Sequence, residues 1–227
     1  MCGLVAMVRL HSGAVLPSPD VLASMTDAMA HRGPDGSAVR ISKDARAAFG
    51  FRRLAIVNLG PDGDQPMSGA GGDVDIVFNG EIYNHAALRR QLEQEGVKFH
   101  SRNSDTEALL NGYIHWGLDG LLARLHGMFA FVIWDGRTKT LLAARDRLGI
   151  KPLYYSVVDG SLALASEIKA IAKHPAFRVR MNARACSDIV QVLATPAPAT
   201  LFDGVFKLGP GKPLPVPADG ATTRGRS

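Results

Sequence analysis

The chain has few of the features that stabilise small secreted proteins or anchor membrane proteins. Only two of its 227 residues, Cys2 and Cys186, are cysteines, which is too few for a disulfide scaffold and typical of free thiols. The longest uninterrupted apolar run, residues 128–134, has seven residues, whereas a membrane-spanning helix needs about 20. No basic lead-in with a long apolar stretch opens the chain, so we expect no signal peptide, no membrane partner and a cytoplasmic location.

Clustered positive charge and metal-ligand spacing are also missing. Lys and Arg number 26 against 21 Asp and Glu, a net charge of +5, but the basic residues are scattered apart from pairs such as Arg52-Arg53. A phosphate-binding face needs a stripe or run of such residues. The seven histidines show no His-Glu-x-x-His or paired Cys-His spacing. We therefore expect neither a nucleic-acid partner nor a metal site.

What the sequence does contain is enough apolar residues, 46%, for the core of one domain. Patterning predicts strands, then helices, then strands again, an order that favours antiparallel sheets with helices outside. The expected strands are 2–10, 38–41, 47–51, 54–57, 74–78, 128–134, 140–144, 153–157 and 162–165. Expected helices begin at caps Ser18, Asn84, Ser104 or Asp105, and Asn182, and end near residues 30, 95, 116 and 194.

The second residue is the first candidate for chemistry. Because Cys2 is small, we expect Met1 to be removed, which makes Cys2 the N-terminal residue. A thiol and a free α-amine would then share one residue, with ordinary pKa values of about 8.5 and about 7.7–8.0. The amine could take the proton of the thiol and return it to a leaving amine. Taken alone, this is weak evidence for catalysis, because an N-terminal cysteine usually has no catalytic role.

A second candidate is the pair Asn79-Gly80, which follows the expected strand 74–78. Asn-Gly pairs commonly form tight turns. Alternatively, the side-chain amide of Asn79 and the backbone N–H of Gly80 could both point at one spot and stabilise a tetrahedral oxyanion. Glycine is needed where the backbone approaches so closely. These residues alone leave both interpretations open.

Arg53 and Asp105 are candidates for binding an amino acid. Such a ligand needs a guanidinium group for its α-carboxylate and an acid for its α-ammonium group. Both residue types are also common on solvated surfaces, and their spacing does not distinguish the two roles.

Several ordered motifs resemble those of class II glutamine amidotransferase domains. They are Met1-Cys2-Gly3-Leu4, HRGPD at 31–35, RLAIV at 53–57, QPM at 65–67 and NGEIYN at 79–84. Others look more narrowly like the glutaminase half of asparagine synthetase: SDTE at 104–107, GMFAF at 127–131, RDRLGIKPLYY at 145–155 and ASEIK at 165–169. The resemblance extends over nearly the whole chain.

The resemblance implies an α+β fold, the N-terminal-nucleophile hydrolase sandwich, with four αββα layers and two antiparallel sheets. It also implies that Cys2 is the nucleophile, that its α-amine is the base, and that Asn79 and Gly80 form the oxyanion hole. The substrate-binding residues that it implies are Arg53 for the glutamine carboxylate, main-chain groups of Ile56 and Val57, and Glu81 and Asp105 for the ammonium group.

Asparagine synthetase also carries an ATP-dependent domain with a Ser-Gly-Gly-x-Asp-Ser phosphate loop, which this sequence lacks. We therefore interpret residues 2–210 as the amidotransferase domain and residues 211–227 as a Pro/Gly-rich tail, truncated before any synthetase domain. The expected reaction is hydrolysis of glutamine to glutamate and ammonia through a Cys2 thioester. The ammonia would amidate aspartate in the absent domain. We expect ATP and Mg²⁺ only in that domain and no cofactor in this chain.

Two alternatives remain. The chain could be the glutaminase half of a related amidotransferase with another acceptor, or a non-catalytic domain of the same fold. An unprocessed Met1 would favour the second, because the α-amine would then be an amide. A homodimer is compatible with either.

Overall fold

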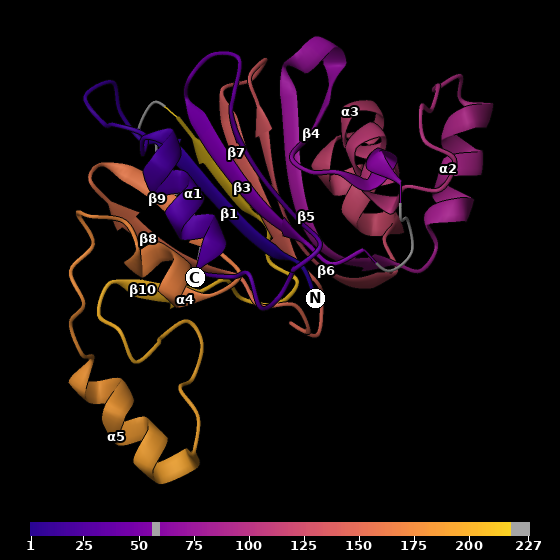
Figure 1. Ribbon diagram of the computed structural model, residues 1–227. Coiled ribbons are helices and arrows are strands. Elements are labelled where there is room, and N and C mark those ends of the chain that lie inside the picture. The colour runs from indigo at the N-terminus through magenta and orange to yellow at the C-terminus, as the bar shows by residue number, and fades with distance from the viewer. Residues whose placement is uncertain (56–59, 219–227) are drawn as a thin grey trace.

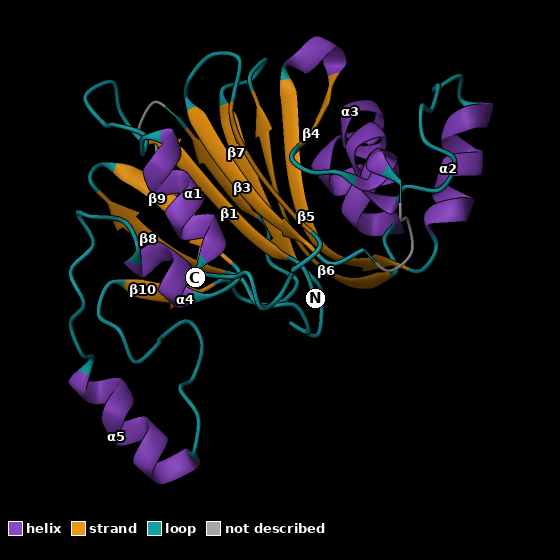
Figure 2. Ribbon diagram, viewed as in Figure 1, coloured by secondary structure: helices purple, strands orange, loops and turns teal. Residues whose placement is uncertain are grey.

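The computed structural model describes residues 1–55 and 60–218, and its two antiparallel sheets lie face to face with helices on the outer sides (Figures 1 and 2). The first sheet has the strand order β10-β8-β9-β1-β3-β2 and the second has β11-β7-β6-β5-β4. The expected α+β sandwich of four layers is confirmed. Among the described residues, no helix is long and apolar enough to cross a membrane.

The strands are β1 (Gly3–Arg9), β2 (Gly36–Ile41), β3 (Ala47–Arg53), β4 (Met67–Gly69), β5 (Val74–Ile82), β6 (Gly127–Asp135), β7 (Thr140–Arg145), β8 (Tyr154–Val158), β9 (Ser161–Ala165), β10 (Val205–Lys207) and β11 (Leu214–Pro217). The helices are α1 (Pro19–Asp27), α2 (His85–Gln94), α3 (Asp105–Arg124), α4 (Ile168–Ala172) and α5 (Ala183–Val192), with short 3₁₀ turns η1 (Pro61–Gly63) and η2 (Ala70–Gly72). Helix α5 stands apart from the two sheets (Figure 1).

Side-chain alternation along β1 divides the apolar residues between two layers. Leu4, Ala6 and Val8 belong to the core between the sheets, whereas Val5 and Met7 pack with α1 and α4 on the outer face. All five side chains are fully buried. A strand buried on both faces reads as a continuous apolar run, which is why this strand could be predicted.

Strand β5 is arranged in the same way in the second sheet. Ile76 and Phe78 face the layer of α2 and α3, and Val77 faces the core between the sheets. Asn79 lies on the Val77 side because successive side chains alternate. Cys2, which packs against the inner core, and Asn79 therefore come to the same end of that layer, where both line one cavity.

Three of the four expected helix caps are confirmed. The side chains of Ser18, Ser104 and Asn182 accept backbone N–H groups in the first turns of α1, α3 and α5, at 3.4, 3.2 and 3.1 Å. Asn84 does not cap α2. Its side chain instead bonds at 2.8 and 3.0 Å to the main chain just before β6.

The structure also differs from the sequence-based expectations in several elements. Leu54 and Ala55 are not in a strand, and the rest of the expected strand 54–57 lies outside the described residues. Gly117, the expected helix end, interrupts α3 with a φ of 71°, but helix resumes beyond it. Helix α4 and the short strands β4, β10 and β11 were not expected.

The folded part also extends beyond residue 210, where we expected the domain to end. Strand β11 pairs with β7 from Leu214↔Ala143 to Pro217↔Thr140. Val216 and Ala218 are buried in the core between the sheets. A proline-rich composition suggested a tail, but edge strands tolerate proline.

Candidate active site

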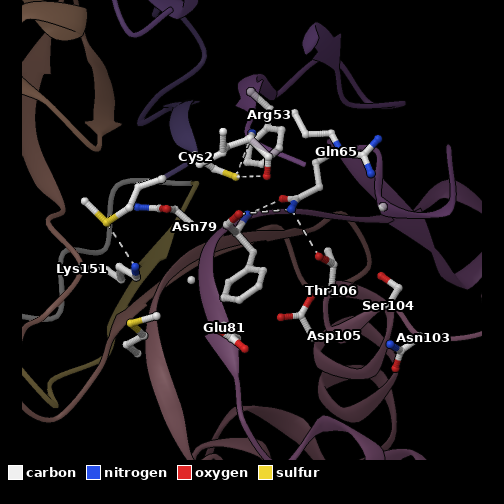
Figure 3. Close-up of a pocket in the computed structure, with 17 residues that line it drawn as sticks. Cys2, Arg53, Gln65, Asn79, Glu81, Asn103, Ser104, Asp105, Thr106 and Lys151 are labelled. Carbon is white, nitrogen blue, oxygen red and sulfur yellow. Dashed lines mark hydrogen bonds between the residues drawn. The ribbon is translucent and has the colours of Figure 1, made fainter. Parts of the chain in front are cut away.

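A cavity of about 200 Å³ opens where the start of β1, the free edge of β5 and the first turn of α3 meet (Figure 3). Six of the residues assigned to the site line this cavity: Cys2, Arg53, Asn79, Gly80, Glu81 and Asp105. The other two, Ile56 and Val57, lie outside the described residues. The structure therefore brings together side chains that are up to about a hundred positions apart in sequence.

The Cys2 thiol contacts the main chain of Leu54. Its Sγ lies 3.4 Å from the backbone nitrogen of Leu54, which donates to it, and 3.7 Å from the carbonyl oxygen, to which the thiol donates. The carbonyl oxygen of Cys2 accepts from Arg32 Nε at 2.9 Å, and Arg32 is in turn paired with Glu167 at 3.0 Å.

The loop containing HRGPD also supports this wall of the cavity. The carboxylate of Asp35 accepts the backbone N–H of Ala55 at 2.8 Å, next to the Leu54 groups that contact Cys2. Gly33 has no room for a side chain, because a Cβ would lie 2.4 Å from the backbone of Arg52. The motif therefore fixes both Cys2 and the segment against which its sulfur packs.

Asn79 and Gly80 lie inside β5, so the turn interpretation is wrong. Asn79 is 1% exposed, and its Nδ2 is buried without a hydrogen-bond partner. An unpaired buried donor costs free energy, so this amide indicates a place for an acceptor that a ligand would supply. A Cβ at Gly80 would lie 2.2 Å from the carbonyl oxygen of Met128, so only glycine fits.

The guanidinium group of Arg53 lies on the Gln65 side of the cavity (Figure 3). It donates to Asp64 at 2.6 Å and to the carbonyl oxygen of Gly60 at 2.8 Å. The Arg53 side chain is 14% exposed and that of Asp64 is 64% exposed. Arg53 is thus paired with an exposed carboxylate of the chain itself, a group of the same kind as the α-carboxylate of an amino acid.

Two carboxylates provide the complementary charge. Asp105 begins α3, and its side chain accepts the backbone N–H of Ile82 at 3.3 Å. Burial raises the pKa of Asp105 although hydrogen bonds from Ile82 and Thr106 oppose the change. Glu81, which follows Gly80 in β5, is exposed. A cationic group bound beside Asp105 would stabilise the ionised form of that carboxyl.

Gln65 and Lys151 are among the polar residues of this cavity to which the sequence analysis gave no role in the site. Both belong to motifs that carry the family resemblance, so a signal for them existed, but no spacing rule gave them a role. Lys151 is 4% exposed, and burial, together with the charge of Arg32, lowers its pKa. Its Nζ lies 3.2 Å from the sulfur of Met1.

Within residues 1–55 and 60–218, no three His, Cys, Asp or Glu side chains are grouped so that they could hold a metal ion.

Comparison with known proteins identifies the family. A family model described as "Glutamine amidotransferase domain" matches residues 1–225. "Asparagine synthetase [glutamine-hydrolyzing] 3" of Bacillus subtilis (strain 168) is 38% identical over 223 residues, 97% of this chain and 35% of that protein. "Amidase chry2" of Gibberella zeae is 38% identical over 222 residues, 93% of this chain and 32% of that protein. The chain thus spans about a third of the length of these curated relatives.

A solved structure shares the fold. Glutamine phosphoribosylpyrophosphate amidotransferase from B. subtilis, complexed with ADP and GMP, has a TM-score of 0.68 at 21% identity, over 95% of this chain and 47% of that chain. The family model and the curated relatives both extend over nearly the full sequence. The chain therefore belongs to the class II glutamine amidotransferase domain family.

Proposed function

We propose that this chain hydrolyses the side-chain amide of glutamine to glutamate and ammonia. The observation that carries the proposal is the buried, unpartnered Nδ2 of Asn79, which lines the same cavity as the thiol of Cys2. A donor held in place before the substrate arrives can stabilise an oxyanion without reorganisation during the reaction.

In the first half of the reaction, the Cys2 sulfur attacks the amide carbon, and the carbonyl oxygen becomes an oxyanion that accepts from Asn79 Nδ2 and the Gly80 N–H. The α-amine of Cys2, free once Met1 is removed, takes the thiol proton and gives it to the leaving nitrogen. The C–N bond breaks and ammonia leaves, with a γ-glutamyl thioester remaining on Cys2. Water then attacks the thioester, which releases glutamate and restores the thiol.

The charged walls of the cavity suit the other end of glutamine. Arg53 would bind the α-carboxylate, and Asp105 and Glu81 would bind the α-ammonium group. Ile56 and Val57 stay predicted as main-chain contacts.

We further propose that the ammonia amidates aspartate in an ATP-dependent domain outside this chain, as the name of the B. subtilis relative suggests. ATP and Mg²⁺ would act only in that domain and should not alter glutamine hydrolysis here. A second candidate is transfer to another acceptor, since an equally similar relative is named an amidase and not an asparagine synthetase. A homodimer and a cytoplasmic location stay predictions.

The test compares the two cysteines. Cys2→Ala should abolish glutamate release from glutamine, whereas Cys186→Ala, a change on α5 outside the cavity, should leave it nearly unchanged. Mass spectrometry of the intact protein should show a chain that begins at Cys2. Equal activity in both variants, or a fully retained Met1 in active protein, would contradict the mechanism, and an inactive wild type would favour the non-catalytic alternative.

A further inference from the structure

The short strand β4 stops pairing with β5 just before the cavity. Its last pairs are Gly69↔Val74, Ser68↔Asp75 and Met67↔Ile76, and residue 66 is a proline, which has no N–H to donate. Continuing this antiparallel register would place residue 65 opposite Phe78. The edge of β5 beyond this point carries the residues of the cavity.

The side chain of Gln65 replaces the missing strand at that position. The backbone N–H of Phe78 donates to Gln65 Oε1 at 2.5 Å, and Gln65 Nε2 donates to the carbonyl oxygen of Phe78 at 3.1 Å. A carboxamide has the same donor and acceptor groups as a peptide, so it satisfies both backbone groups of one β5 residue. Gln65 is 7% exposed, and its amide is therefore shielded from water.

The same amide also contacts helix α3 on another side of the cavity. Nε2 also donates to the Thr106 hydroxyl at 3.2 Å, in the first turn of α3 beside Asp105. Figure 3 shows Gln65 between β5 and Thr106, with dashed lines to both. Both N–H groups and the oxygen of the amide are thus in use, and neither glutamate nor an apolar residue could make all three bonds.

This arrangement fixes the backbone directly before Asn79. Since Nδ2 of Asn79 has no partner of its own, its direction depends on how the backbone of β5 is held. Alternation also directs the N–H of Gly80 to the same edge as that of Phe78. Gln65 therefore controls the place at which both oxyanion donors meet.

We infer that Gln65 is a positioning residue for the oxyanion hole, acting through Phe78 on Asn79 and Gly80. The inference rests on the proposed glutamine hydrolysis. Because the oxyanion exists only in the transition state and intermediate, loss of Gln65 should lower kcat and leave KM nearly unchanged.

The experiment is a double-mutant cycle of Gln65→Glu and Asn79→Ala, with kcat and KM for glutamine measured on each protein. Gln65→Glu keeps the acceptor and loses both donors. We expect Asn79→Ala to lower kcat by about 10²–10³. Gln65→Glu should lower it at least about tenfold on its own and by a smaller factor in the Asn79→Ala background, where only the Gly80 N–H remains to be positioned, since residues acting as a unit are not additive.

A matched control separates positioning from stability. Ser68 on β4 donates to Asp75 on β5, away from the cavity, so Ser68→Ala weakens the same strand pair. It should lower Tm without lowering kcat. Thr106→Val, which removes a single bond from Gln65, serves if Gln65→Glu does not fold; it should lower kcat less than Gln65→Glu does, and again by a smaller factor when Asn79 is absent.

Equal fold-losses of kcat with and without Asn79, or a change confined to KM, would overturn the inference while the proposed function stands. Failure of the wild type to hydrolyse glutamine would instead overturn the proposed function, and this inference with it.

Discussion

Asp105 is a residue whose chemistry conflicts with the stability of the fold. Burial raises its pKa above the ordinary value, which means that the folded chain holds the ionised carboxyl less favourably than the unfolded chain does. A raised folded pKa contributes stability at low pH and removes it as the pH rises. At neutral pH the carboxylate therefore destabilises the empty fold, a common cost at binding sites.

Replacing this carboxylate should separate its two effects. We expect Asp105→Asn to raise Tm at pH 7 and to raise the KM for glutamine, because the amide keeps the acceptor for Ile82 but lacks the charge. The gain in Tm should shrink as the pH is lowered to about 3, where the carboxyl is protonated in both states.

The matched control for this experiment is Asp119→Asn, an exposed aspartate on the same helix. It should change neither Tm nor KM measurably. A lower Tm at pH 7 in Asp105→Asn, together with an unchanged KM, would contradict both the stability argument and the assignment of Asp105 to substrate binding.

At this scale the sequence offered candidates whose chemistry is intrinsic, and the family resemblance selected among them. The chemical properties of such a residue do not depend on the fold: a thiol such as Cys2 is a nucleophile, a guanidinium such as Arg53 binds anions, and a glycine such as Gly80 allows close backbone approach. Gln65 could not be found in this way, because its role exists only through a strand register that places it opposite Phe78. No local pattern encodes that register.

At the scale of elements, β5 shows why the Asn79-Gly80 pair is ambiguous in sequence. The same dipeptide that favours a turn is extended here because β6 pairs with it residue by residue, with Asn79↔Ala130 and Gly80↔Phe129. Tertiary pairing overrides the local preference.

The close approach at Gly80 gives a stability prediction. Gly80→Ala would place a Cβ 2.2 Å from the carbonyl oxygen of Met128 and 2.8 Å from Cα of Phe129, so β5 and β6 must separate. We expect a loss of about 1–3 kcal/mol or more in the free energy of unfolding, measured with urea. In Gly36→Ala the Cβ would be 3.5 Å from that of Arg53, an ordinary contact, and the change should stay within about 0.5 kcal/mol. Similar losses in the two variants would show that the crowding is relieved easily.

Helix α3 shows that sequence signals for the end of a helix can be wrong. The Ser104 cap predicted its start correctly, and Gly117 was interpreted as its end. The φ of 71° and ψ of −179° at Gly117 do break the helix, in a conformation that is essentially restricted to glycine. The chain then resumes helix because Leu121 is fully buried in the layer between α3 and β5. The packing of Leu121 therefore determines that the helix continues beyond Gly117. No local sequence signal distinguishes a break within a helix from its end.

At the scale of the whole molecule, strand order depends on contacts that are remote in sequence. Strand β1 lies between β3 and β9, with Val5 opposite both Gly50 and Ala165. The periodicity of each segment predicted strands and their antiparallel class, but it cannot select partners more than a hundred residues away. The four-layer arrangement therefore followed from the family resemblance and not from the patterns.

The extent of the folded part leads to a prediction about truncation. A variant ending at Pro210 loses β11, and with it the burial of Val216, worth about 1.5–3 kcal/mol, and the cover of β7. We expect a lower Tm and concentration-dependent aggregation by light scattering. A variant ending at Gly220 keeps β11 and should match the full chain. If both variants behave like the full chain, the division at residue 210 would be the better one.

Strand β11 also determines where the second sheet ends. Leu214 and Val216 are the residues of this strand that can donate backbone N–H groups, and Ala218, on the same side, donates to Lys139 at 2.9 Å. Because directions alternate, the nitrogens of Pro215 and Pro217 face away from β7, and neither carries a hydrogen. The outer rim of this strand thus presents carbonyl oxygens without donors. A strand of another chain placed against this rim could donate hydrogen bonds to the carbonyl oxygens but could accept none. Strand β11 therefore protects the sheet against edge-to-edge association.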